Sequence, residues 1–225
     1  MVQPTHPATP STPAQRERYD RVLATAASIL SVGGGEALQM KELAQKADVS
    51  LATLYRYFPS KDHVLLALSL ANYQSAARKI LAETPHGDTP RERVTAHLMR
   101  EFRAQQRQQH LTAALTNVLT QTDATYSDII ETIGQLHQQI IRHVAFAGAP
   151  VTEQQRRLLP IIVDNFGSAS RRWLTGMCSA AEARFQIRIG CHLLDLSDEQ
   201  IEEEMERGAL AVALTGDLPG TSLAW

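Results

Sequence analysis

The sequence predicts an all-α protein of about nine or ten helices, with a small N-terminal head and a larger C-terminal helical bundle. Apolar residues recur at three- and four-residue spacing through most of the 225 residues, as they do in helices with one buried face. No stretch shows the alternation of apolar and polar residues that is typical of strands. Clusters of glycine, proline and polar residues separate the periodic segments and predict short loops.

The first helix is expected over residues 15–31. It follows a tail, residues 1–14, whose Pro/Ser/Thr-rich composition predicts disorder. The glycine triplet Gly33–Gly35 should end the helix. The residues of its apolar stripe are Tyr19, Val22, Leu23, Ala26, Ala27 and Leu30.

Residues 39–58 have the pattern of two short helices joined by a tight turn. The segment Met40–Ala47 is rich in helix formers, and Asp48 and Val49 interrupt its apolar face. Ser50 is placed to cap a second helix, Leu51–Phe58. This arrangement is typical of a helix-turn-helix, whose second helix lies in the major groove of DNA.

The second of these helices is crowded with hydrogen-bonding side chains, which suit phosphate oxygens and base edges. We expect Ser50, Thr53 and Arg56 near base edges, and Tyr55, Tyr57 and Lys61 on phosphates; Ser60 should cap the helix that Lys61 begins. A helical hairpin that merely has a polar face is the alternative. The candidate DNA-contacting residues are Gln39, Met40, Lys41, Ser50, Leu51, Ala52, Thr53, Tyr55, Arg56, Tyr57 and Lys61.

The run VSLATLYRYFPSKDHVL, from Val49 to Leu65, resembles the signature of the TetR-type transcriptional repressors. It departs from that signature at Ala52, where the family usually has glycine. The resemblance implies an N-terminal operator-binding head, a ligand-sensing body and a homodimer. Arg16, Arg18 and Arg21 near the start of the first helix would then either touch the DNA backbone or belong to a solvated face.

The periodicity of the body predicts its helices in order. The helix over residues 61–81 is longer than a head requires and should link the head to the body. After a loop rich in glycine and proline, apolar stripes predict helices over residues 91–107, 110–120 and 125–147.

The C-terminal helices begin with a capping box formed by Thr152 and Gln155. Pro160 should kink the helix that follows, which reaches Met177, or mark a late start. A last long helix is expected over residues 180–196. We therefore expect a DNA-binding domain at residues 15–60, a ligand-sensing and dimerisation domain at 61–197, and a short acidic helix with a mobile tail at 198–225.

In the resembled family the last two long helices pair with their counterparts as a four-helix bundle, which maps here to residues 153–177 and 180–196. The candidate interface residues are Phe166, Ser170, Trp173, Phe185, Ile189 and Leu193. The candidate ligand-binding residues are Leu70, Leu98, Met99, Phe102, Leu115, Leu119, Ile133, Leu136, Phe166 and Trp173. For the aromatic members, ordinary core packing is the alternative.

Two body segments, ALTNVLTQTDATYSDIIETIGQLHQQII and RRWLTGMCSAAEARFQIRIGCHLL, are similar to the actinobacterial repressors of sterol catabolism within the same family. This resemblance implies a large hydrophobic effector such as a steroid or an acyl-CoA thioester. The alternative is a DNA-binding protein whose body is an architectural or protein-interaction module. An enclosed apolar cavity of about 300 Å³ or more would favour the sensor.

Composition and motifs argue against the other function classes. Residues 1–81 carry a net charge of +3 and the remainder −5, a sign that suits a DNA-binding head. No catalytic motif, phosphate-binding glycine loop or membrane-length apolar run is present, so we expect a cytoplasmic protein that is not an enzyme and needs no cofactor. Cys178 and Cys191 predict buried thiols. The histidines fall on separate helices or far apart on one, a spacing that predicts no metal site: His97, His110, His137, His143 and His192.

Overall fold

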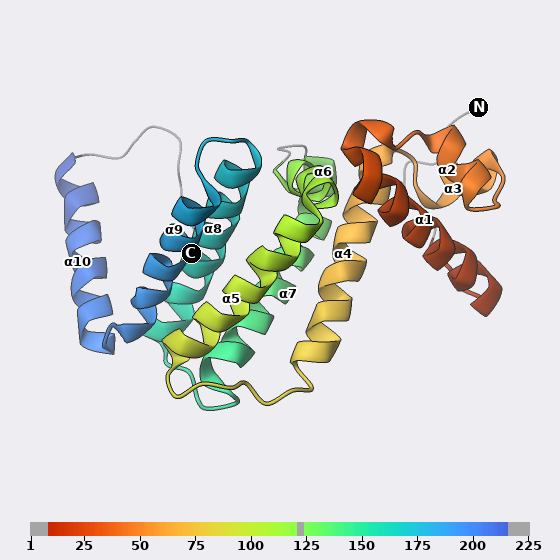
Figure 1. The fold of residues 1–225 in the computed structure, drawn as a ribbon. Coiled ribbons are helices and arrows are strands. Elements are labelled where there is room, and N and C mark those ends of the chain that lie inside the picture. Colours follow the sequence, from red (N-terminus) through yellow and green to blue (C-terminus); the bar gives the residue numbers. More distant parts are fainter. Residues whose placement is uncertain (1–8, 121–123, 216–225) are drawn as a thin grey trace.

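The computed structural model describes residues 9–120 and 124–215, and this part of the chain forms ten α-helices and two 3₁₀ turns without a strand (Figure 1). The predicted all-α class is confirmed. The helices are α1 (Pro13–Ala37), α2 (Met40–Lys46), α3 (Leu51–Tyr57), α4 (Lys61–Ile80), α5 (Pro90–Arg107), α6 (Gln109–Leu119), α7 (Ser127–Phe146), α8 (Glu153–Leu174), α9 (Ala180–Cys191) and α10 (Asp198–Thr215). Residues 1–8 of the predicted N-terminal tail and residues 216–225 of the C-terminal one lie outside the described residues.

The head consists of α1, α2 and α3 packed around one apolar cluster. Leu30 of α1, Leu43 of α2 and Leu54 of α3 are each fully buried in it. The glycine triplet interrupts α1 as predicted, because Gly34, whose φ is +64°, is not helical, and a short further helical stretch follows it to Ala37. The break brings the end of α1 against α6, where an added Cβ on Gly35 would lie 3.6 Å from Cβ of Ala114.

Helix α6 belongs to the body in sequence but shares the core of the head. Leu111, Ala114 and Val118 of α6 are buried in the same cluster as the residues of α1 and α4. Helix α4 begins in the head and runs along the body beside α7 (Figure 1). The head is therefore joined to the body through two helices, α4 and α6.

A second apolar cluster forms the core of the body, between α5, α7, α8 and α9. Arg93 of α5 holds the C-terminus of α7, because its guanidinium donates hydrogen bonds to the carbonyl oxygens of Val144 and Ala145 at 3.1 Å. Helices α8 and α9 approach closely at Gly190, where an added Cβ would lie 2.1 Å from Nδ2 of Asn165.

The C-terminal helices follow the predicted capping but not the predicted ends. The Thr152–Gln155 capping box is present, and α8 runs through Pro160 without a late start. Helix α9 ends at Cys191 and continues as a 3₁₀ turn, while α10 extends to Thr215, beyond the acidic segment expected.

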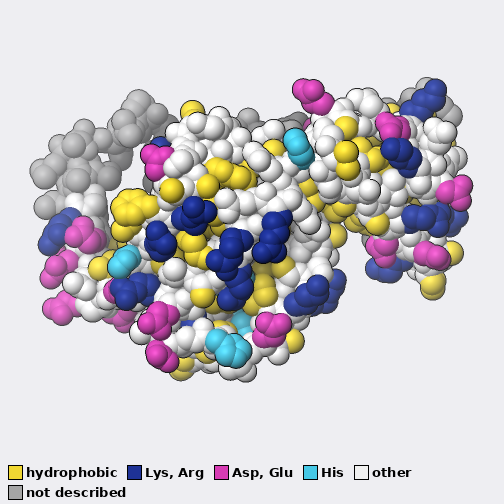
Figure 2. Space-filling model, viewed as in Figure 1, with side chains coloured by type: hydrophobic (Ala, Val, Ile, Leu, Met, Phe, Trp, Pro, Cys, Tyr) yellow, Lys and Arg dark blue, Asp and Glu magenta, His cyan; other side chains and the backbone are white. Residues whose placement is uncertain are grey.

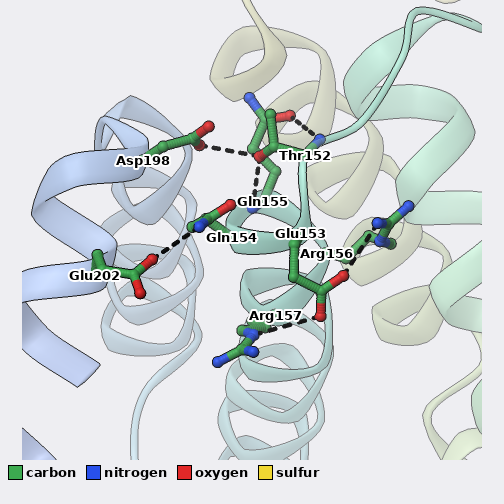
Figure 3. Close-up of polar contacts among 8 residues, drawn as sticks. All are labelled: Thr152, Glu153, Gln154, Gln155, Arg156, Arg157, Asp198 and Glu202. Atoms are coloured by element: carbon green, nitrogen blue, oxygen red, sulfur yellow. Dashed lines mark hydrogen bonds and ion pairs between the residues drawn. The ribbon is translucent and has the colours of Figure 1, made fainter. Parts of the chain in front are cut away.

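Polar contacts attach α10 to the first turn of α8 (Figure 3). Thr152 Oγ1 donates to Asp198 Oδ1 at 2.9 Å, and Gln154 Nε2 donates to Glu202 Oε2 at 2.8 Å. Ile201 of α10 is buried in the core of the body. Helix α10 is thus held beside α8 at the end of the molecule that lies opposite the head (Figure 1).

Candidate DNA-binding surface and ligand cavity

The turn between α2 and α3 is held by an arginine of α1. Arg21 Nε donates to the carbonyl oxygen of Ala47 at 2.8 Å, and its NH2 group donates to that of Asp48 at 3.3 Å. Asp48 has a φ of +52°, a conformation that aspartate adopts more readily than most residues. Arg21 is exposed to solvent, yet its guanidinium anchors the helix-turn-helix through these two hydrogen bonds.

Ser50 begins α3 as predicted. Its hydroxyl oxygen accepts from the backbone N–H of Thr53 at 3.1 Å, and its hydroxyl hydrogen is donated to Thr53 Oγ1 at 2.8 Å. The Thr53 hydroxyl is thereby oriented as an acceptor for Ser50 and keeps its own hydrogen for another partner. This leaves Thr53 able to donate to a base edge or phosphate.

Ten of the eleven candidate DNA-contacting side chains are exposed or half-buried. Gln39, Lys41, Ser50, Leu51, Ala52 and Arg56 are exposed, and Met40, Thr53, Tyr55 and Lys61 are half-buried. Lys61 lies at the start of α4, which Ser60 caps as expected.

Tyr57 lies in the core of the head and not on the surface, where it was expected to hold a phosphate. It is only 3% exposed, and its ring packs edge-on to Tyr19 with the centroids 5.9 Å apart. The Arg56 guanidinium lies 5.0 Å from the centre of the Tyr57 ring and donates to its hydroxyl at 3.3 Å. Tyr57 therefore positions Arg56, whose side chain remains on the surface.

The body contains a cavity of about 500 Å³ between α4, α5, α6 and α7. Two candidate ligand-binding residues, Leu115 and Leu119, line it. Leu98, Phe102 and Phe166 are instead buried in the core of the body, and Met99, Leu136 and Trp173 pack against that core. Leu70 and Ile133 also lie outside the lining. Six of these eight therefore contribute to the core of the body, whereas other apolar residues of α4, α6 and α7, among them Tyr73, Leu111 and Ile140, line the cavity.

Three ionisable side chains that sequence reasoning missed meet in the wall of the cavity. Nε2 of His137, from α7, lies 3.5 Å from Oε2 of Glu101, and Nε2 of His97 lies 3.7 Å from the same oxygen. His97 and Glu101 are four residues apart on α5, a spacing that places them on one face. Only the fold brings His137 to them.

The electrostatics of this cluster follow from its burial. Burial lowers the pKa of His97, and the nearby Glu101 only partly opposes that effect. Burial alone would raise the pKa of Glu101, but His137 and His97 outweigh it and lower that pKa below its ordinary value. The pKa of Tyr73, whose ring centre lies 5.3 Å from that of His137, is raised by burial and by Glu101. At neutral pH, Glu101 is therefore ionised and His97 is neutral.

Helices α8 and α9 expose part of the apolar surface proposed for dimerisation. Phe185 and Ile189 of α9 are 61% and 52% exposed, and Ile161 of α8 is 52% exposed. Phe166 and Ser170 are buried within the chain and are unavailable to a partner. Trp173 and Leu193 are half-buried against the core of the body.

The described residues contain neither a metal site nor a membrane-spanning helix. No group of three or more His, Cys, Asp or Glu side chains there is arranged to hold a metal ion. None of the described helices is long and apolar enough to cross a bilayer. Cys178 is half-buried and Cys191 is buried, both as free thiols.

Comparison with known proteins identifies both parts of the chain. Residues 22–68 match the family described as bacterial regulatory proteins, tetR family, and residues 87–194 match the tetracyclin repressor-like C-terminal domain. The chain is 34% identical over 187 residues to the HTH-type transcriptional repressor KstR of Mycolicibacterium smegmatis, with 83% of this chain and 91% of the relative covered.

Solved structures agree with this relationship. A TetR transcriptional regulator from Rhodococcus sp. RHA1 superposes with a TM-score of 0.73 at 27% identity, covering 81% of this chain and 97% of that one. The regulator FadR of Bacillus subtilis, solved in complex with stearoyl-CoA, shares the fold at 15% identity, with a TM-score of 0.58 over 78% of this chain and 97% of that one. The chain belongs to the TetR family of bacterial transcriptional regulators.

Proposed function

We propose that this repressor binds a palindromic operator as a homodimer and is released when a hydrophobic effector enters the cavity between α4, α5, α6 and α7. The observation that carries the proposal is the double role of α6. Leu111 lines the cavity and is also buried in the core of the head, beside α1. A ligand that moves α6 must therefore move the head as well, because packed cores shift as units and do not deform freely.

The DNA-binding half of the proposal rests on α3. Thr53 and Arg56 are oriented by Ser50 and Tyr57 respectively, and such positioned polar side chains suit base edges. One such head reads only a half-site, so a second copy is required about one helical turn away. The exposed apolar residues Ile161, Phe185 and Ile189 support a two-fold contact through α8 and α9.

The effector should combine an apolar body with an anionic end. Leu115, Leu119 and Ile140 give the cavity apolar walls. Arg100 lies at its rim, and Arg103 and Arg107 are exposed on the same helix, α5. Figure 2 shows Lys and Arg side chains gathered over the middle of the body. An acyl-CoA thioester, with its apolar chain inside and its phosphates outside, fits this distribution of charge.

The relatives support the same class of effector. FadR of Bacillus subtilis was solved with stearoyl-CoA, and the body of this chain resembles repressors of sterol catabolism. A steroid or a steroid thioester therefore remains within the proposed class. Release by about 100-fold would require roughly 2.7 kcal/mol of coupling between the cavity and the head.

An architectural body without an effector is the competing function. The volume of the cavity exceeds about 300 Å³, which meets one part of the expectation for a ligand site and favours the sensor. It differs from the expected enclosed cavity because exposed residues such as Asn72, Glu83 and Gln108 form part of its rim. An open rim suits a ligand whose polar end stays in water.

The test begins with an operator selected from a pool of random duplexes. Stearoyl-CoA should release the protein from that operator in a mobility-shift assay, and free CoA should not. Leu115→Trp should fill part of the cavity, so it should abolish release while operator binding is retained. Operator binding that neither stearoyl-CoA nor a steroid thioester alters would contradict the sensor and favour the architectural body.

A further inference from the structure

The cavity wall concentrates unpaired polar atoms. Among the described residues, five buried side-chain polar atoms lack a hydrogen-bond partner, and four of them belong to residues that line this cavity. They are Ser69 Oγ, His97 Nε2, Gln105 Oε1 and His137 Nε2. A buried polar atom without a partner is costly, and native structures contain few of them. Their concentration in one wall indicates that the occupant of the cavity supplies hydrogen bonds there.

The strongest part of this wall is the His97–Glu101–His137 cluster. The side chains of His97 and His137 are only 8% and 7% exposed, and Glu101 is 25% exposed and lines the cavity. Both imidazole nitrogens lie 3.5 Å or more from Glu101 Oε2, beyond the usual length of an N–H···O hydrogen bond. The two imidazole nitrogens therefore face the Glu101 carboxylate at ion-pair distance, and neither has a hydrogen-bond partner of ordinary length.

We propose that this cluster is a subsite for a hydroxyl group carried on the apolar part of the effector. The hydroxyl donates its hydrogen to the Glu101 carboxylate and accepts a hydrogen bond from an imidazole N–H of His97 or His137. The inference deepens the proposed effector function and rests on it, because it names the chemistry of the group that enters the cavity.

Other functional groups match this subsite less well. A ketone oxygen can only accept, so it would face the Glu101 carboxylate with no hydrogen to share. A carboxylate or phosphate would meet Glu101 charge to charge. A hydrocarbon would supply a hydrogen bond to neither imidazole. An ammonium ion can donate to Glu101 but cannot accept from an imidazole N–H, so an amine probe separates charge attraction from hydroxyl recognition.

The experiment uses matched cyclic probes that differ only in one group: cyclododecanol, cyclododecanone, cyclododecylamine and cyclododecane. Calorimetry on the intact protein should show that the alcohol binds roughly tenfold or more tightly than the ketone, since a site built for a hydroxyl rejects an analogue that lacks it. Glu101→Gln should narrow or reverse that preference, because the amide can donate to a ketone. Leu119→Ala, in the apolar wall, is the matched control and should weaken alcohol and ketone alike.

Each outcome decides the hydroxyl subsite separately from the sensor function. Equal binding of alcohol and ketone, tighter binding of the amine, or no binding by any probe overturns the subsite. A preference that survives Glu101→Gln, in a variant of unchanged helicity, overturns it as well. Release of the operator by stearoyl-CoA is measured independently of probe binding. Release without an alcohol preference would support the sensor function and contradict the hydroxyl subsite. An alcohol preference without release would support the subsite and contradict the sensor function.

Discussion

Nε of Arg21 lies 2.8 Å from the carbonyl oxygen of Ala47, and this contact joins the first helix of the head to the turn of the helix-turn-helix. The carbonyl is one of the free acceptors at the C-terminus of α2, where a positive charge is also favoured by the helix dipole. The same guanidinium reaches Asp48, the residue with positive φ. One side chain of α1 therefore stabilises the turn that sets the angle of α3.

Arg21→Met should lower the free energy of unfolding by about 1–3 kcal/mol and weaken operator binding, because the turn loses a charge-assisted hydrogen bond. Urea denaturation and a mobility-shift assay measure the two effects. Arg18→Ala, an exposed residue of the same helix, is the control and should leave stability unchanged. If Arg21→Met weakened DNA binding but left stability unchanged, Arg21 would instead contact the DNA backbone.

Lys61 should contact a phosphate, because it lies half-buried at the start of α4, where backbone N–H groups and the helix dipole favour anions. Lys61→Ala should weaken binding to all duplexes alike and reduce the slope of log K against log salt by about one unit. Titrations at several salt concentrations measure that slope. An unchanged slope would show that Lys61 does not contact a phosphate of the DNA.

At least one of the two residues Thr53 and Arg56 should read a base. Alanine at the base-reading position should cost about 1–3 kcal/mol on the selected operator and less on random DNA. Competition assays with both duplexes separate the two losses for Thr53→Ala and Arg56→Ala. Equal losses on both duplexes for both variants would place direct readout elsewhere, at Ser50 or Gln39.

The fold of the head could be predicted from sequence because its signals are local. The Ser50 and Ser60 caps and the stripe of α1 depend on neighbours within one or two turns. Tyr57 was misplaced because its spacing did not reveal that its ring packs against Tyr19 of α1. Tyr55 and Tyr57 look alike in the sequence pattern. Only the packing between helices shows that Tyr55 is half-buried and that Tyr57 lies in the core.

The sequence suggested that the body could contain a cavity but did not show which residues line it. Periodicity marks residues that face other helices, and Phe102 and Phe166 do so by filling the core. A cavity forms where stripes diverge, and this depends on helix angles that no single stripe encodes. The one local signal was the four-residue spacing of His97 and Glu101 on α5, whereas His137 joins them from a separate helix.

Acid should destabilise the protein partly through His97. Burial places the pKa of His97 in the folded chain below its ordinary value of 6.5, so the unfolded chain binds more protons as pH falls. The contribution of His97 to stability is therefore full above pH 6.5, declines as pH falls towards the lowered pKa, and levels off below it. Glu101 and Arg100 on α5, Tyr73 on α4 and His137 on α7 face or influence the same imidazole.

His97→Gln should flatten the loss of unfolding free energy between about pH 7 and pH 5, measured by urea denaturation at each pH. His63, whose pKa burial also lowers, contributes a slope of the same sign from the head, so His63→Gln should remove its own separate part. His86→Gln, in an exposed loop, is the control. A His97→Gln profile that superimposes on that of the parent protein would show that His97 does not carry this dependence.

Substitutions at two isoleucines of α9 distinguish an effect on dimerisation from an effect on folding. Ile189 is 52% exposed in the single chain, whereas Ile187 is completely buried. Ile189→Asp should therefore leave the fold of one chain intact. It should place an uncompensated charge in the interface that α8 and α9 form with the second chain, at a cost of several kcal/mol. The variant should sediment as a helical monomer and lose operator binding, since one head reads only a half-site.

Ile187→Asp is the matched comparison, because the same charge two residues away would enter the core of the body and unfold it. A parent interface of standard size, about 1,600 Å² in total, should survive dilution well below micromolar concentration. Sedimentation of the parent protein as a monomer at micromolar concentration would refute the α8–α9 dimer. Ile189→Asp that remains a dimer and still binds the operator would place the contact on another face, because a central aspartate cannot be accommodated in a two-fold apolar interface without loss of affinity.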